Sequence, residues 1–183
     1  MEKQYRAKET SSHGHGAVYW VTGLSGAGKT TIASLFFQKL KMVEPCTVFL
    51  DGDQLRNTVA EDLGYKPEER RRAAMRYSRL CKLLADQGIN VVCATISMFH
   101  ECRDWNRENI DIYREIYLKV PVEVLVRRDS KNIYSRALSS ETSEVMGVDL
   151  EFEEPRSPDI VVENHKSAGP SEIVDDLFNT FYP

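Results

Sequence analysis

The sequence has no apolar run as long as a membrane-spanning helix requires. Its first 16 residues, MEKQYRAKETSSHGHG, contain no apolar segment like that of a signal peptide. The four cysteines have no C-x-x-C spacing, and the net charge of −4 gives no general attraction for nucleic acid or an anionic membrane. We therefore expect a cytoplasmic protein with buried free thiols that contacts neither a membrane nor nucleic acid.

A chain of 183 residues, 42% of them hydrophobic and 28% charged, suits one domain with a sizeable core. We expect residues 1–16 to form a flexible tail and residues 17–183 to form that domain. His13 and His15 lie in the Ser/Gly-rich tail, where disorder is a better expectation than a metal site.

Short apolar runs alternate with helical patterns, which predicts an α/β fold of three layers around a mostly parallel five-stranded sheet. The expected strands are residues 17–22, 46–51, 89–97, 114–120 and 159–164. The expected helices are residues 30–42, 68–87, 103–110 and 171–181, with 122–128 left undecided. The acidic stretch at 139–158 fits neither pattern, and we expect it to be a lid.

The segment GLSGAGKT at residues 23–30 matches G-x-x-x-x-G-K-[ST] between a predicted strand and a predicted helix. Glycines let backbone N–H groups curl around a phosphate, and the helix N-terminus faces the same anion. We therefore predict a P-loop that binds ATP and Mg²⁺, with Lys29 on the phosphates and the Thr30 hydroxyl on the metal. The predicted nucleotide-binding residues are Gly23, Ser25, Gly26, Gly28, Lys29, Thr30 and Thr31.

A second signal, FLDGD at residues 49–53, ends the next predicted strand. Carboxyl ends of parallel strands line the ligand crevice, so Asp51 and Asp53 are expected to face Lys29. Two carboxylates there suit Mg²⁺, which Asp51 is expected to help hold, and a general base for an attacking hydroxyl. A solvated Asx turn is the alternative.

Five arginines follow that second signal, and their forked guanidinium groups suit phosphate or sulfate. We expect one or two of them to bind an anion and the others to be solvated. The five are Arg56, Arg70, Arg71, Arg72 and Arg76.

Together these segments resemble the adenylyl-sulfate (APS) kinase family, which transfers the γ-phosphoryl group of ATP to the 3′-hydroxyl of APS. The likeness runs from about residue 18 to 164 and rests on GLSGAGKTT, LDGDQLR, DLGYKPEER, LLADQGINVVCATIS and RDSKNIY. It implies that Asp53 orients or deprotonates the acceptor hydroxyl and that the protein is a homodimer. It also implies an acceptor site built from Arg56, Tyr65, Arg70, Ile96 and Ser97.

The chain departs from the family in the acceptor half. The family's N-I-R-R is Ala73-Ala74-Met75-Arg76 here, and the proline of I-S-P-Y is Met98. The family's lid has a phenylalanine that stacks on the acceptor base, and this chain has Val145 at that position. Residues 139–154 include six acidic residues and no Lys or Arg. An acidic lid repels a polyanionic acceptor unless a metal or arginines compensate.

Three functional hypotheses remain. The first is a kinase acting on APS, and the second is the same 3′-hydroxyl kinase retuned to another nucleotide, such as cytidine diphosphoramidate. The third is a P-loop switch without an acceptor, although the guanine-reading N-K-x-D motif is absent. Arg128 and Arg136 flank the lid, where they are either ligands of the migrating charge or surface residues.

Overall fold

A five-stranded parallel sheet forms the centre of the molecule. The computed structural model describes residues 14–129, 132–139, 145–165 and 168–183. The strand order is β2-β3-β1-β4-β5, and all four pairings are parallel. The strands are β1 (Val18–Thr22), β2 (Thr47–Asp51), β3 (Asn90–Ala94), β4 (Tyr113–Leu118) and β5 (Ile160–Val162).

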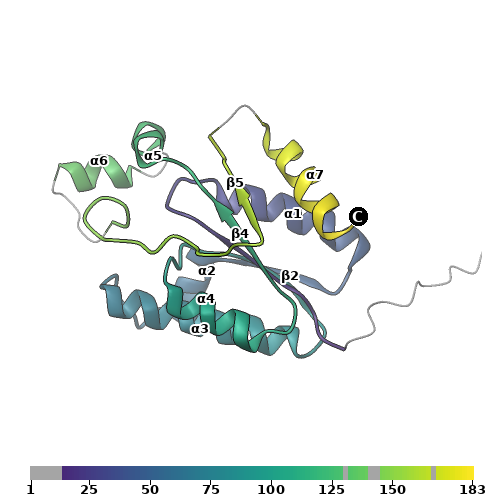
Figure 1. The fold of residues 1–183 in the computed structure, drawn as a ribbon. Coiled ribbons are helices and arrows are strands. Elements are labelled where there is room, and N and C mark those ends of the chain that lie inside the picture. The colour runs from purple at the N-terminus through teal and green to yellow at the C-terminus, as the bar shows by residue number, and fades with distance from the viewer. Residues whose placement is uncertain (1–13, 130–131, 140–144, 166–167) are drawn as a thin grey trace, which may run out of the picture.

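Helices cover both faces of the sheet, as Figure 1 shows: α1 and α7 pack on one face, and α3 and α4 pack on the other. This arrangement confirms the predicted three-layer α/β sandwich. The helices are α1 (Lys29–Val43), α2 (Gly52–Val59), α3 (Pro67–Ala85), α4 (His100–Asn109), α5 (Val122–Arg128), α6 (Ile133–Leu138) and α7 (Pro170–Phe181).

The elements differ from the predicted ranges in several places. The undecided segment 122–128 is helical, and β3 ends at Ala94 rather than at residue 97. Two helices, α2 and α6, were not predicted. Helix α2 has few apolar residues, but the Asp51 side chain caps it by accepting a hydrogen bond from the Asp53 N–H.

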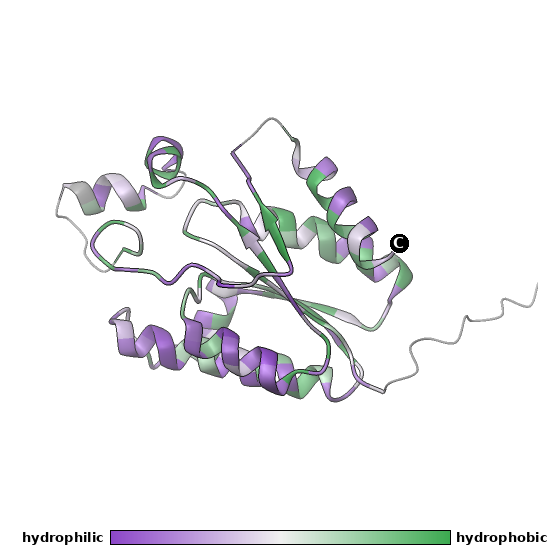
Figure 2. Cartoon of the chain, viewed as in Figure 1, coloured by the Kyte–Doolittle hydropathy of each residue, from purple (hydrophilic) through white to green (hydrophobic). Residues whose placement is uncertain are grey.

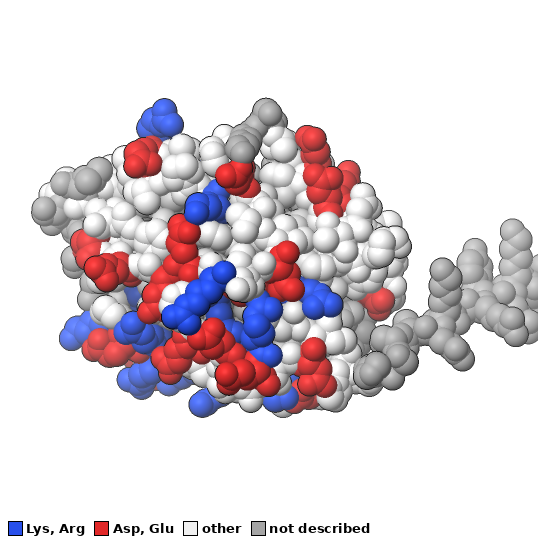
Figure 3. Space-filling view, viewed as in Figure 1, with Lys and Arg blue, Asp and Glu red and all other residues white. Residues whose placement is uncertain are grey.

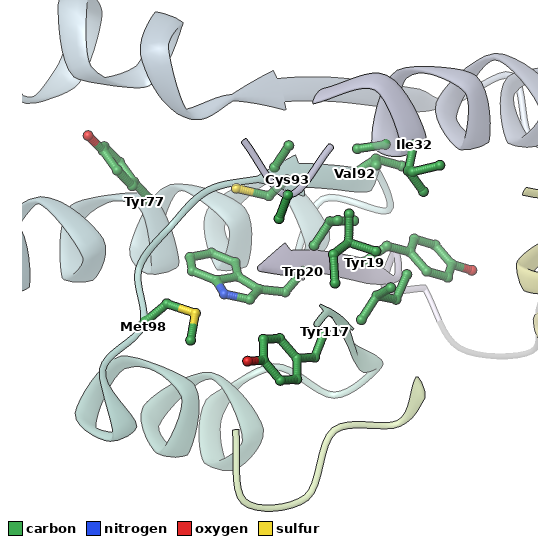
Figure 4. Close-up of a cluster of buried hydrophobic side chains, with 14 of the residues drawn as sticks. Tyr19, Trp20, Ile32, Tyr77, Val92, Cys93, Met98 and Tyr117 are labelled. Carbon is green, nitrogen blue, oxygen red and sulfur yellow. The ribbon is translucent and has the colours of Figure 1, made fainter. Parts of the chain in front are cut away.

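The core lies around β1, whose five residues are all buried because the strand has neighbours on both sides and helices on both faces. Trp20 of β1 lies within the buried cluster that Figure 4 shows, together with Met98 and Tyr117. Hydrophobic residues concentrate in the strands, whereas α3 and α4 are mostly hydrophilic on the side seen in Figure 2. Among the described residues, no helix is long and apolar enough to span a membrane.

The expectation of buried thiols is correct for three of the four cysteines and wrong for the fourth. Cys81, Cys93 and Cys102 are buried and free, but Cys46 is exposed because it lies in the bend that leads into β2. Burial raises the pKa of the Cys102 thiol to about 12, so this group stays protonated and unreactive at neutral pH.

Residues 1–13 of the predicted tail, including His13, lie outside the described residues. Gly16 is buried, and its N–H donates to the Ala85 carbonyl at 2.7 Å. His15 contacts the Asp111 carboxylate through Nδ1 at 2.5 Å.

Candidate active site

The glycine-rich loop between β1 and α1 curls around the N-terminus of the helix. Gly26 has φ 75° and Gly28 has φ 90°, conformations that glycine adopts without steric cost. A Cβ at Gly28 would also lie 2.5 Å from Nδ2 of Asn164. Gly23 does not itself line the cavity. A Cβ there would lie 2.6 Å from the Leu118 carbonyl, so this glycine allows close approach to β4.

Three carbonyl groups of this loop are held by side chains. Lys29 Nζ donates to the Leu24 carbonyl, the Tyr134 hydroxyl donates to the Ser25 carbonyl, and Asn164 Nδ2 donates to the Ala27 carbonyl, each at 2.8 Å. Carbonyls fixed in this way leave the N–H groups of the loop to face an anion. Tyr134 comes from α6, and Asn164 follows β5, so segments far along the chain shape the loop.

Asp51 connects the glycine-rich loop to α2. The residue is only 9% exposed, and its carboxylate accepts hydrogen bonds from the Thr30 hydroxyl at 2.8 Å and from the Asp53 N–H at 2.9 Å. The predicted metal ligands, Thr30 and Asp51, are therefore in direct contact. Asp53 lies in the first turn of α2, and it lines the same cavity as Lys29 and Thr30.

A cavity of about 410 Å³ joins these groups to the predicted acceptor residues. This volume lies within the range of small-molecule sites. Apart from Gly23, the predicted site residues all line it, and so do further residues of α3, β3, α6 and the lid. The predicted ones are Ser25, Gly26, Gly28, Lys29, Thr30, Thr31, Asp51, Asp53, Arg56, Tyr65, Arg70, Ile96 and Ser97.

Two arginines meet at the Tyr65 ring on the acceptor side of the cavity. The Arg56 and Arg70 guanidinium carbons lie 4.7 and 5.1 Å from the ring centroid. Arg70 Nε also donates to the Tyr65 carbonyl at 2.7 Å, and Arg56 Nη1 donates to the Leu63 carbonyl at 3.3 Å. These contacts hold two positive charges beside the cavity opposite the glycine-rich loop.

The other three arginines of the cluster do not line this cavity. Arg76 forms an ion pair with Asp62, and Arg71 contacts the Phe99 ring and Glu153. Together with Arg72 they line a separate surface groove on α3. The structure thus separates Arg56 and Arg70 from the solvated members of the cluster.

One wall of the cavity follows the end of β3. The chain leaves the strand through Thr95, Ile96 and Ser97, and Ser97 adopts φ 24°, which is strained for a residue other than glycine. Its hydroxyl lies 2.8 Å from that of Thr95, and Thr22 Oγ1 donates to the Ile96 carbonyl at 2.5 Å. This wall therefore offers hydroxyl groups to a ligand at a fixed position.

The described part of the lid forms a tight turn that closes one side of the cavity. Val145 and Met146 are buried and line the cavity, and Gly147 at φ 87° packs close to Leu24 of the glycine-rich loop. The turn is held by Asp149, which accepts a hydrogen bond from the Val145 N–H at 2.6 Å. The position that lacks the family's phenylalanine therefore faces the ligand space.

Three of the four carboxylates at residues 149–154, those of Asp149, Glu153 and Glu154, contact local groups, and none of the four lines the cavity. Glu154 pairs with Lys119 at 3.0 Å, and Glu153 lies 3.6 Å from Arg71 and accepts from the His100 N–H. Burial alone would raise the pKa of Glu153, but these contacts and the charge of Arg103 hold it below its ordinary value. Repulsion by residues 149–154 is therefore weaker than the sequence indicates. Figure 3 shows the two signs of charge interleaved on this face. Ser143, Glu141 and Glu144 lie outside the described residues.

Several cavity residues were not predicted. Ala73 and Tyr77 of α3, Phe99, and Ile133 of α6 all line the cavity. The signal that could have found the first two is their spacing of four residues on the inner face of α3, which places their side chains together.

Arg128 and Arg136, which flank the lid in the sequence, do not line the cavity. Arg128 donates to the Asn164 carbonyl at 2.8 Å.

The sheet is parallel, and a glycine-rich loop of the phosphate-binding type follows its central strand. An acidic residue, Asp53, lines the same cavity. These features are typical of a P-loop kinase. Comparison with known proteins gives the family. The adenylylsulphate kinase family model matches residues 15–163, and the chain belongs to that family. It is an ATP-dependent phosphotransferase with a hydroxyl acceptor, which sets aside the hypothesis of a switch without an acceptor.

The relatives include kinases with different acceptors. The chain is 42% identical to the adenylyl-sulfate kinase of Clostridium acetobutylicum, covering 91% of this chain and 82% of that one. It is 40% identical to the cytidine diphosphoramidate kinase of Campylobacter jejuni, covering 80% and 85%. The structure of the Mycobacterium tuberculosis APS kinase in complex with AMPPNP and APS superposes with a TM-score of 0.83. That protein is 31% identical, and the match covers 92% of this chain and 99% of that chain.

Proposed function

We propose that this protein phosphorylates the 3′-hydroxyl of a nucleotide, with APS as the leading acceptor. The observation that carries this proposal is the pair of guanidinium groups, from Arg56 and Arg70, that meet at Tyr65 on the acceptor side of the cavity. Guanidinium forks suit the oxygens of a phosphosulfate. The APS kinase resemblance assigns them the same role.

The residues of this chain divide the work of phosphoryl transfer. Lys29 and the N–H groups of the glycine-rich loop bind the phosphates of ATP, and Asp53 accepts the proton of the acceptor hydroxyl and aligns its oxygen. Mg²⁺ usually takes one or two protein ligands together with phosphates and water, and the adjacent oxygens of Thr30 and Asp51 suit that arrangement. When bound, the ion would neutralise phosphate charge.

The second candidate acceptor is cytidine diphosphoramidate, and a specific observation favours it. Val145 and Ala73 both line the cavity, at positions where the family resemblance places a stacking phenylalanine and an asparagine. A cavity without those groups offers a stacking ring and an amide fewer to the adenine and the phosphosulfate of APS. The relative with this activity is 40% identical.

The test is ADP release with ATP and Mg²⁺ against a panel of acceptors: APS, cytidine diphosphoramidate, and their parent nucleoside monophosphates. Products are mapped by ³¹P NMR to locate the new phosphate. Turnover on APS that places the phosphate at the 3′-position supports the leading proposal, and turnover on the cytidine compound alone supports the second. Release that is equal with and without every acceptor contradicts both.

A homodimer and a cytoplasmic location belong to the same proposal. The family resemblance supports the first, and the sequence composition supports the second. Light scattering after gel filtration measures the assembly directly, and a mass of one chain, 20.9 kDa, contradicts the dimer.

A further inference from the structure

Tyr77 lines the cavity, and its hydroxyl has no partner among the described residues. Its side chain is only 4% exposed and belongs to α3. No hydrogen bond joins this hydroxyl to any of the described residues. The hydroxyl is not fully enclosed either. In this it differs from Ser78 Oγ, which is enclosed and has no partner among the described residues. A tyrosine hydroxyl normally finds a partner when its ring is buried, so the open cavity is the place for one.

The direction of the side chain agrees with this view. In Figure 4 the ring of Tyr77 extends from α3, and its hydroxyl points away from the buried side chains of Trp20, Cys93 and Met98. The ring therefore packs its apolar part on the core while its polar end leaves the core. Tyrosine is well suited to such a boundary, because one end is apolar and the other is wet.

Ala73 lies one helical turn before Tyr77 and makes room for the ring. Side chains on a helix lean toward its N-terminus, so residue 77 covers the surface beside residue 73. Ala73 and Ala74 are both buried and small, and Ala73 lines the cavity. The family resemblance places an asparagine at position 73, and a phenol one turn away can supply a hydrogen-bond donor in its place.

Charge next to Tyr77 indicates the kind of ligand group. Burial raises the pKa of the Tyr77 phenol, although the neighbouring charge of Arg56 opposes that shift. The phenol is therefore neutral at pH 7 and available as a donor. Its surroundings combine a cation with an uncharged donor, which suits one anionic oxygen of a phosphoryl group.

We infer that Tyr77 is a specificity-determining residue of the acceptor site, whose hydroxyl donates a hydrogen bond to a phosphoryl oxygen in the tail of the acceptor nucleotide. The inference rests on the proposed function. A neutral donor beside the positive charge of Arg56, which lines the same cavity, suits an anionic phosphoryl oxygen at this point.

The test is Tyr77→Phe, which removes one oxygen and keeps the ring. The KM of the acceptor should rise roughly 3- to 10-fold, the range expected for one hydrogen bond, while the KM of ATP and the melting temperature stay unchanged. Tyr113→Phe is the matched control, since Tyr113 is a buried tyrosine of β4 that does not line the cavity. It should leave both KM values unaltered.

Ala73→Asn in the Tyr77→Phe background provides a rescue, because the amide restores a donor one turn away. Partial recovery of the acceptor KM supports the inference. An unchanged acceptor KM in Tyr77→Phe overturns the inference alone and leaves the proposed function standing. A wild-type protein that phosphorylates no nucleotide of the panel overturns the proposed function and the inference with it. If Tyr77→Phe melts lower, acceptor-induced shifts in melting temperature still report binding, and equal shifts in both proteins overturn the inference.

Discussion

Replacing Asp53 with Asn should slow phosphoryl transfer while leaving ATP binding nearly intact. The carboxylate lies in the first turn of α2 and lines the cavity beside Lys29 and Thr30. The backbone N–H of residue 53 is held by Asp51, and that bond survives the substitution. Asparagine has almost the same shape, so the change removes charge and basicity and little else.

The magnitude follows from the role of the side chain. A positioned general base contributes about 10²–10⁴ in rate, so kcat should fall by that factor. Each factor of ten corresponds to about 1.4 kcal/mol, which makes the loss of transition-state stabilisation about 3–5 kcal/mol. The KM of ATP should change less than about threefold, because Thr30 and Asp51 remain paired.

Two measurements on the same protein decide the result: ADP release at saturating acceptor, and titration calorimetry with AMPPNP. Asp104→Asn is the control, since this carboxylate is exposed on α4 and does not line the cavity. Its kcat should equal that of the wild type. An Asp53→Asn protein with unchanged kcat and much weaker AMPPNP binding would refute the reasoning and move Asp53 to the ATP side.

Other substitutions test the remaining parts of the site. Lys29→Ala should lower kcat by at least about 10²-fold, since the phosphates lose a positive charge, while circular dichroism stays native; near-normal turnover contradicts the P-loop assignment. Tyr134→Phe should weaken ATP binding up to about tenfold, because the Ser25 carbonyl loses its 2.8 Å partner, and an unchanged calorimetric Kd shows that the contact is irrelevant to ATP. Val145→Phe should improve acceptance of APS through stacking worth about 1–3 kcal/mol, and a poorer KM for APS contradicts the assignment of this wall. The pKa of Glu153 is lowered by the fold, so its carboxylate stabilises the protein above about pH 4.5 and this contribution disappears as the pH falls through the lower, folded-state pKa. The free energy of unfolding, measured with urea at pH 7 and pH 3, should change less between the two pH values in Glu153→Gln than in the wild type. An equal change in both proteins contradicts the lid contact.

The ATP half of the site could be predicted from the sequence because its signal is contiguous. The loop from Gly23 to Thr30 carries its glycines, lysine and threonine in one segment, and Asp51 follows the next strand. Both segments follow strands of one parallel sheet, and the carboxyl ends of such strands lie at the same edge, so the two segments come together although β3 lies between β1 and β2. The side chains that hold the loop carbonyls, Tyr134 and Asn164, were missed, because nothing local in the sequence relates them to a loop more than 100 residues away.

The acceptor half could be predicted only in part. Arginines of α3 look alike in sequence, and tertiary contacts decide that Arg70 reaches Tyr65 whereas Arg76 pairs with Asp62. The end of β3 was placed too late because Thr95–Ser97 continues an apolar run, yet the chain turns there with Ser97 at φ 24°. The charge of the lid was misleading for the same reason, since partners such as Lys119 come from other elements.

This division of the site explains why overall similarity does not decide the acceptor. The chain is 42% identical to an adenylyl-sulfate kinase and 40% identical to a cytidine diphosphoramidate kinase. These two values are too similar to distinguish between the two acceptors. A pocket discriminates between ligands through the few polar and stacking groups that touch the part in which they differ, each worth about 1–3 kcal/mol. In this cavity the positions that could carry such groups lie on α3 and the lid turn, at Ala73, Tyr77 and Val145, and none of them belongs to the glycine-rich loop. We therefore propose that this wall sets the choice of acceptor, and substitutions there should shift KM among nucleotides while the ATP kinetics stay constant.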